Sequence, residues 1–333
     1  MVVKEQFPGE SWDAPGIWHG SNSNRISLEG HLHGLVDKDH PSVIKFLGNH
    51  VNRKLRMIRT YTAYAELGDL FTLVRNHARM QRTADENGRP LSIVTRIPTV
   101  AIFCICEAMA ASVCLMAHGQ VPDDQGQWAP GCGDGDGPNP PWPHNIIHQD
   151  IKSPNFFLSK CTNSTTWREL PLAALGDFGN SFDALDQWWI DHPDFQIGMG
   201  TTNSQAPEQV SGSGIPGPLS SATNVFQVGL IMYELMTMFP PTHQMTFEDQ
   251  RHPFPPLDHR PCLQALVQLA SECISIVPAT RPSPKEFYMR MRKMTTEMPQ
   301  SPRIPSHRSP WGKSSLEFDL LWRDPQSLAC SRV

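Results

Sequence analysis

The stretch HNIIHQDIKSPNFFLS, residues 144–159, decides how the rest of the sequence is read. It places Asp150, Lys152 and Asn155 in a D-x-K-x-x-N spacing between two short apolar runs. Such runs predict two short buried strands, with the polar residues in the loop that joins them. A carboxylate, an amine and an amide at a fixed spacing in one loop could form a functional site. The simpler interpretation is that they cap turns beside the core.

Four further motifs follow in a fixed order. They are LAALGDFGNS (residues 172–181), GTTNSQAPEQ (200–209), TNVFQVGLIMYEL (223–235) and ATRPSPKEF (279–287). The order resembles that of the eukaryotic protein-kinase superfamily of the serine/threonine type, whose catalytic loop, DFG turn, APE segment, central helix and late arginine occur in this sequence. Each motif alone is weak, and the five together carry the resemblance.

The resemblance implies a role for each polar residue of the first two motifs. Asp150 would orient the substrate hydroxyl and accept its proton, and Lys152 would offset charge on the transferring phosphoryl group. Asn155 and Asp177 would present hard oxygen ligands to Mg²⁺ that bridges the phosphates of ATP. The implied cofactors are therefore ATP and Mg²⁺, and Lys152 two residues after Asp150 favours a protein Ser/Thr hydroxyl as acceptor.

Upstream residues take their meaning from the same resemblance. MVVK at the start is similar to the strand whose lysine, here Lys4, pairs the nucleotide phosphates with a helix glutamate, for which Glu29 is the candidate. An ordinary edge strand is the alternative. The stretch RTYTAYAELGDL resembles the hinge, which implies that Ala63 and Ala65 offer backbone groups to adenine and that Asp69 lies near the ribose. A plain strand followed by a turn is the alternative here.

Three other positions concern how the chain is held together. Glu208 and Arg281 resemble a buried ion pair that fastens the activation segment. Gln149 replaces the arginine that grips an activation-loop phosphate, so control by phosphorylation of Thr201 or Thr202 is not expected. Asn224 replaces an aspartate that holds the catalytic-loop backbone, and its amide can accept the same hydrogen bonds without charge assistance.

The resemblance predicts an α+β, bilobal, protein-kinase-like fold. Residues 1–69 would form an incomplete small lobe, since no G-x-G-x-x-G precedes Lys4, and residues 70–297 a large, mainly helical lobe. A Gly/Pro-rich insertion at 120–143 and a disordered Pro/Ser-rich tail at 298–333 complete the predicted organisation. The missing glycine loop is compatible with a clipped gene product, a fragment or a pseudokinase.

Local patterns give finer expectations. Residues 1–7 alternate like a strand and lead into a loop through Asn24, after which Ser27 caps a short helix. VIKFLG (43–48) and MIRTYTAYA (57–65) read as strands. Residues 100–117 are apolar over about the length that spans a bilayer, but Glu107 at the centre favours a buried core helix. Residues 225–239 read as a second such helix.

Composition narrows the class of protein. The 333 residues carry 28 Lys and Arg against 33 Asp and Glu, a formal net charge of −5, without a basic block, so neither a nucleic-acid nor a membrane partner is expected. The start lacks a signal-peptide pattern, and eight cysteines without metal-like pairing read as reduced thiols. We therefore expect an intracellular protein, cytoplasmic or nuclear.

The leading hypothesis is a serine/threonine-protein kinase that transfers the γ-phosphoryl group of ATP to a protein hydroxyl. Asp150, Asn155 and Asp177 favour this enzyme. The alternative is a catalytically impaired pseudokinase that acts as a binding or scaffold module, which the absent glycine loop favours. Transfer to a small molecule is disfavoured by the APE-like segment, and the oligomeric state stays open.

Overall fold

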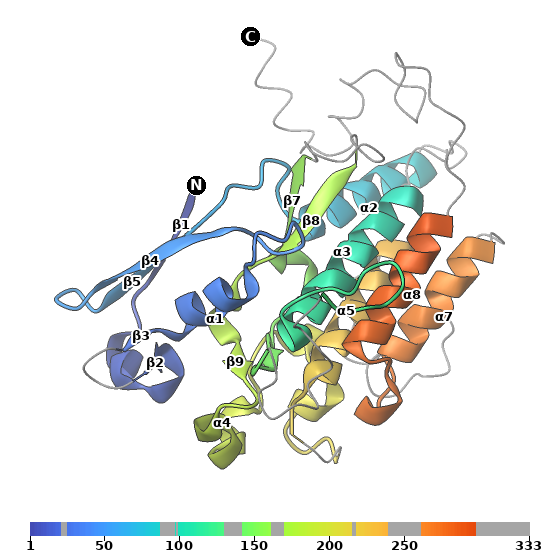
Figure 1. The fold of residues 1–333 in the computed structure, drawn as a ribbon. Coiled ribbons are helices and arrows are strands. Elements are labelled where there is room, and N and C mark those ends of the chain that lie inside the picture. The colour runs from blue at the N-terminus through green and yellow to red at the C-terminus, as the bar shows by residue number, and fades with distance from the viewer. Residues whose placement is uncertain are drawn as a thin grey trace, which may run out of the picture.

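The structure is a computed structural model of the chain, shown as a ribbon in Figure 1. It describes residues 1–20, 25–86, 97, 99–129, 142–160, 170–214, 218–238 and 261–297. Half of the predicted insertion, residues 130–141, and the whole of the predicted tail, residues 298–333, lie outside these ranges.

The described chain mixes helices with small sheets. The helices are α1 (Leu28–Val36), α2 (Leu70–Glu86), α3 (Thr99–His118), α4 (Gln187–Asp191), α5 (Ser221–Thr237), α7 (Pro261–Cys273) and α8 (Pro284–Glu297). The strands are β1 (Val2–Gln6), β2 (Trp18–His19), β3 (Ile26–Ser27), β4 (Phe46–Asn52), β5 (Met57–Thr62), β6 (Ile146–Ile147), β7 (Phe156–Lys160), β8 (Pro171–Leu175) and β9 (Phe182–Asp183).

An antiparallel sheet in the order β1-β5-β4 forms one side of the molecule, as Figure 1 shows in blue. Lys4 lies in the middle of β1, opposite Thr60 of β5, so the pairing of the two strands fixes the position of its backbone. The strand expected over residues 43–48 begins later, at Phe46. The reason is that Ile44 donates its backbone N–H to the Leu175 carbonyl (2.8 Å), which ties this part of the chain to β8 instead of β5.

Helix α1 forms where the sequence predicts it. The Ser27 hydroxyl accepts a hydrogen bond from the Gly30 N–H and so caps the first turn. Leu28, Leu32 and Val36 fall on one face and are buried, which stabilises the helix against the rest of the core. This packing fixes the position of Glu29 on the first turn.

The stretch between β1 and α1 is more ordered than the expected loop. It contains two 3₁₀ turns, Gly9–Asp13 and Pro15–Ile17, followed by β2, which pairs with β3. Trp12 is buried and packs edge-on against Trp18. The many Gly and Pro residues favoured a loop in the sequence analysis. The two tryptophans instead give the stretch a small apolar centre of its own.

The central part of the fold is a set of long helices, with α3 and α5 surrounded by α7, α8 and the β7-β8 hairpin (Figure 1). Helix α3 is long and apolar enough to cross a bilayer, but 72% of its apolar window is buried inside the protein. Its Glu107 accepts a hydrogen bond from Arg292 of α8 (2.7 Å). The helix therefore serves as a core helix in this structure.

A buried ion pair joins two distant parts of the helical region. Arg281 holds Glu208 in a bidentate contact, with Nη1 to Oε1 at 2.6 Å and Nη2 to Oε2 at 2.8 Å. The Thr223 hydroxyl donates to the same carboxylate, and the Arg281 guanidinium stacks over Phe226. Both charged side chains are almost fully inaccessible to solvent, so neither could be solvated if its partner were removed.

Removing one partner of this pair is expected to destabilise the fold strongly. Glu208→Ala or Arg281→Ala will lower the free energy of unfolding by about 3–5 kcal/mol, because the remaining charge stays buried and unpaired. Urea denaturation measures the effect. Arg290→Ala is the matched control, since Arg290 and its partner Glu272 are part-exposed, and it should cost about 1 kcal/mol or less. Equal losses for the buried and the exposed pair would contradict the prediction.

Candidate functional site

The loop between β6 and β7 carries the D-x-K-x-x-N residues, and α5 holds its backbone. The Asn224 amide accepts from the His148 N–H (3.0 Å) and donates to the Ile146 carbonyl (2.8 Å). Gln227, one turn further along α5, accepts from the Ile151 N–H and donates to the Gln149 carbonyl. Two buried amides thus fix the backbone on both sides of Asp150, and Asn224 both accepts and donates where a carboxylate could only accept.

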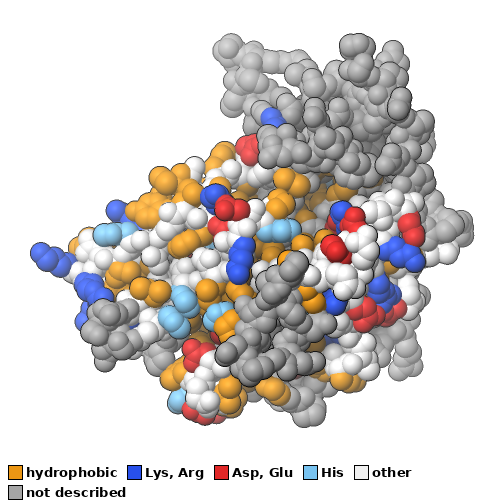
Figure 2. All heavy atoms as spheres, viewed as in Figure 1, with side chains coloured by type: hydrophobic (Ala, Val, Ile, Leu, Met, Phe, Trp, Pro, Cys, Tyr) orange, Lys and Arg blue, Asp and Glu red, His pale blue; other side chains and the backbone are white. Residues whose placement is uncertain are grey.

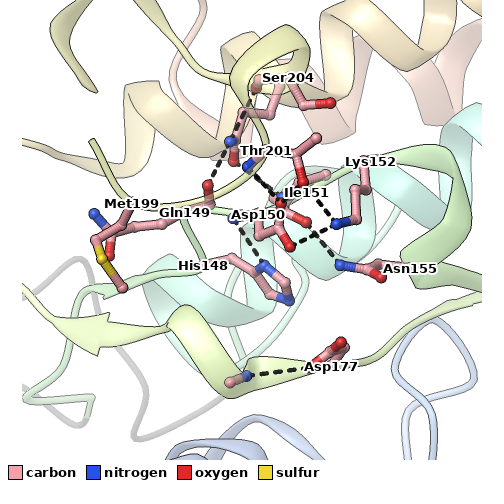
Figure 3. A network of polar contacts seen from close by, with 12 residues as sticks. His148, Gln149, Asp150, Ile151, Lys152, Asn155, Asp177, Met199, Thr201 and Ser204 are labelled. Atoms are coloured by element: carbon pink, nitrogen blue, oxygen red, sulfur yellow. Dashed lines mark hydrogen bonds and ion pairs between the residues drawn. The ribbon is translucent and has the colours of Figure 1, made fainter. Parts of the chain in front are cut away.

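Asp150 is buried, with 7% of its surface exposed, and its carboxylate lies at the centre of the polar network that Figure 3 shows. Its Oδ1 accepts from the backbone N–H (2.9 Å) and the hydroxyl (2.7 Å) of Thr201, and its Oδ2 accepts from Lys152 Nζ (2.8 Å). Lys152 also donates to the Thr201 hydroxyl (2.7 Å). Asp150 and Lys152 therefore converge on one hydroxyl-bearing side chain.

Asn155 and Asp177 come from the ends of the β7-β8 hairpin. Asn155 donates from Nδ2 to the Asp150 carbonyl (2.9 Å), which leaves its amide oxygen as the atom available to a cation. Asp177 follows β8 with a left-handed φ of 62°, and its carboxylate accepts from the Gly179 N–H. This turn points the carboxylate away from the strand and toward Lys4.

Lys4, Glu29 and Asp177 meet although 173 positions separate the first from the last. Lys4 Nζ lies 3.0 Å from Glu29 Oε1 and 2.6 Å from Asp177 Oδ1. Burial works to lower the pKa of Lys4, but the two carboxylates outweigh it and hold that pKa above its ordinary value. Burial raises the pKa of Glu29, whereas for Asp177 the attraction of Lys4 outweighs burial and lowers the pKa. Glu29 also lines a pocket of about 410 Å³ whose other walls come mostly from the stretch between β1 and α1.

The residues expected to form a hinge join β5 to α2. The Ala63 N–H donates to the Lys45 carbonyl (2.9 Å), and Ala65 is buried. The Asp69 carboxylate caps α2, accepting from the N–H (2.8 Å) and hydroxyl (3.1 Å) of Thr72. Asp69 therefore has a structural role as the cap of α2. Its position near a ribose stays a prediction, as do the contacts of Ala63 and Ala65 with a nucleobase.

His148 is a buried structural residue directly before Gln149 and Asp150. Its Nε2 lies 3.2 Å from the Gly176 carbonyl and must bear the proton, while Nδ1 accepts from the Asp150 N–H. Burial lowers the pKa of His148 to about 4. The neutral ring thus links the β6-β7 loop to the backbone just before Asp177.

Comparison with known proteins finds partial similarity to protein kinases. The chain is 24% identical over 214 residues to the G2-specific protein kinase fin1 of Schizosaccharomyces pombe, across 62% of this chain and 24% of that protein. It is 25% identical over 163 residues to a probable serine/threonine-protein kinase of Dictyostelium discoideum, across 46% and 19% of the two chains.

Both relatives are named as protein kinases. No protein-family model matches the chain. The matched region spans about a quarter or less of the length of these two relatives. Together the similarities indicate a relationship to protein kinases, and they leave catalytic activity to be tested.

Sequence reasoning missed several residues that build the site. From the sequence, Thr201 is considered only as a phosphorylation site, whereas its hydroxyl contacts both Asp150 and Lys152. The Gln149 side chain donates to the Gln196 carbonyl (2.7 Å). An amide thus forms a hydrogen bond at the position where the resembling family has arginine. Gly200 lets the chain approach this loop closely, because a Cβ there would lie 2.2 Å from the Gln149 carbonyl oxygen.

The structure thus groups the predicted residues into two sets. Asp150, Lys152 and Asn155 form one set in the β6-β7 loop, and Lys4, Glu29 and Asp177 form the other. His148 and the Gly176 backbone connect them. The first set brings a carboxylate and an ammonium to the Thr201 hydroxyl, and the second joins one ammonium to two carboxylates.

The buried neutral His148 makes stability depend on pH. In the unfolded chain a histidine takes up a proton near its ordinary pKa of 6.5, but folded His148 stays neutral down to about 4. The unfolded state binds more protons between these values, so stability falls as pH falls, by about 2 kcal/mol from this residue at about pH 5. Urea denaturation across this range measures the slope.

Substitutions assign the slope to His148. His148→Gln will be less stable near neutral pH but will show a shallower pH dependence. The matched control is His50→Gln, since His50 is exposed on β4 and its replacement should leave the slope unchanged. His31, whose pKa burial also lowers to about 4, will keep part of the dependence in both variants. An identical slope in parent and His148→Gln would contradict this role.

Proposed function

We propose that the chain is a protein serine/threonine kinase that transfers the γ-phosphoryl group of ATP to a protein hydroxyl, with a bilobal kinase-like fold. The observation that carries the proposal is the convergence of Asp150 and Lys152 on the Thr201 hydroxyl, at the distances given above. The partial similarity to serine/threonine kinases supports it.

The donor set suits Mg²⁺ bound together with a nucleotide. In the part of the chain that the structure describes, no three His, Cys, Asp or Glu side chains gather to hold a metal by themselves. One carboxylate and one amide oxygen, from Asp177 and Asn155, match the way Mg²⁺ binds when phosphates supply further ligands. The bound metal would neutralise phosphate charge.

Each protein group has a role in this proposal that follows from its chemistry. Asp150 would orient the acceptor hydroxyl and take its proton, since its carboxylate already accepts from a hydroxyl in this structure. Lys152 would offset charge on the group in transfer. Lys4, held by Glu29, would place phosphate oxygens, because its ammonium is fixed and its pKa is raised.

Asp150→Asn is expected to reduce phosphoryl transfer by about 100-fold or more, as loss of a positioned general base does. Transfer of radiolabel from ATP to a generic Ser/Thr protein substrate measures it. Asp39→Asn is the matched control, because Asp39 is part of an exposed ion pair with Lys45 at a distance in sequence from the site. Transfer that is equally absent from the parent and from Asp150→Asn would favour the scaffold module instead.

Nucleotide binding is expected to require Mg²⁺ through Asp177. Asp177→Asn will weaken binding of ATP in the presence of Mg²⁺ and will remove most of the difference between titrations with and without the metal. Isothermal calorimetry measures both affinities, with Asp39→Asn again as the control. Binding that is tight and unchanged in Asp177→Asn would show that the metal assignment is wrong.

A further inference from the structure

The segment around α4 combines negative charge with a lack of cations. No Lys or Arg occurs from Glu169 to Gln250. Asp186, Asp191 and Asp194 lie on α4 and the 3₁₀ turn Pro193–Gln196 or beside them, and none of the three forms an ion pair with another residue that the structure describes. Their charges are therefore free to act on whatever approaches this part of the surface.

Large apolar side chains are exposed on the same segment. We call them the 185–199 surface: Leu185 (56% exposed), Ile190 (52%), Phe195 (58%), Ile197 (37%) and Met199 (41%). In Figure 2, orange and red side chains lie next to one another along the lower edge of the molecule, where Figure 1 places α4. Exposed apolar side chains gathered in one place commonly mark an interaction site.

Contacts of Trp189 and Gln196 with neighbouring residues fix the backbone of the 185–199 surface. Trp189 packs on Phe182 with ring centroids 5.0 Å apart, and the buried Gln196 side chain donates to the Trp189 carbonyl (2.8 Å). Gln149 of the catalytic loop donates to the Gln196 carbonyl. Asp186 caps α4 by accepting from the Trp188 N–H. A surface fixed in this way loses little conformational entropy when a partner binds.

The surface leads directly to the candidate active site. The Gly198 N–H donates to the Gln209 carbonyl (2.8 Å), and Gln209 donates to the carbonyls of Met199 and Gln149. Two residues after Met199, Thr201 contacts the Asp150 carboxylate. A polypeptide that rests on the 185–199 surface therefore has a short path to Asp150.

We propose that the 185–199 surface docks a segment of the protein substrate that combines Lys or Arg with bulky apolar residues. The aspartates favour a cationic segment, and the exposed Ile190 and Phe195 favour apolar contacts. A second copy of this chain fits less well, because a symmetric contact would place aspartates opposite aspartates. The inference rests on the proposed function for the meaning of Asp150, but docking itself needs no phosphoryl transfer.

Binding of fluorescent peptides to the full chain without ATP tests the proposal. Four peptides share one serine and differ in their flanks, which are basic and apolar, basic only, apolar only, or acidic and apolar. Fluorescence anisotropy measures the dissociation constants. We expect the basic and apolar peptide to bind at least about 10-fold more tightly than the others, and added salt to weaken its binding.

Paired variants separate the two contributions. Ile190→Ser with Phe195→Ser should weaken the basic and apolar peptide by about 10-fold, and Asp191→Asn with Asp194→Asn should abolish its preference over the apolar-only peptide. Val277→Ser and Glu297→Gln are the matched controls, since both side chains are exposed elsewhere on the chain. Circular dichroism confirms that each variant is folded.

Three outcomes would overturn the proposal. The first is equal binding of all four peptides, and the second is binding by the folded variants that matches the parent. The third is a sedimentation coefficient that falls in Ile190→Ser with Phe195→Ser, since the surface would then join two copies of the chain. None of these depends on activity, so a chain that docks the peptide but transfers no phosphate would contradict only the proposed function.

Discussion

The attachment of the β6-β7 loop backbone to α5 is the constraint on which the candidate site depends. Asn224 and Gln227 lie one turn apart on a helix whose other side chains are mostly apolar and buried. Their amides form hydrogen bonds with backbone groups of Ile146, His148, Gln149 and Ile151, and the Gln149 carbonyl accepts from Gln209 as well. The left-handed conformation of Gln149, with φ of 64°, persists because both flanks are fixed in this way.

The second set of residues depends on packing between the sheet and the helices. Glu29 is placed by the buried face of α1, Lys4 by its register on β1, and Asp177 by the turn after β8. Backbone hydrogen bonds between Ile44, Ser42 and Leu175 hold β8 against the chain that leads into the sheet. The ion pairs of Lys4 then need little side-chain rearrangement, because all three backbones are already in position.

The sequence was most informative where residue type and spacing act locally. Ser27 and its apolar partners predicted α1, and the apolar run around Glu107 predicted a buried α3. The spacing of Asp150, Lys152 and Asn155 predicted one polar loop. Contacts that depend on the tertiary path could not be predicted: nothing near Thr201 indicates that its hydroxyl meets Asp150, and nothing near Gln196 indicates that its carbonyl meets Gln149. The start of β4 at Phe46 likewise follows from a backbone contact with Leu175.

The β6-β7 loop is held to residues 196–209 in two ways: the charged groups of Asp150 and Lys152 bind Thr201, and uncharged amides form the other contacts. Gln149, Gln196, Gln209 and Gln227 act through amides and backbone carbonyls. Dissolved ions screen interactions between charges but have little effect on hydrogen bonds between neutral buried groups. The neutral amide contacts should therefore change little with ionic strength, whereas added salt should screen the Asp150–Lys152 ion pair, whose lysine is partly exposed.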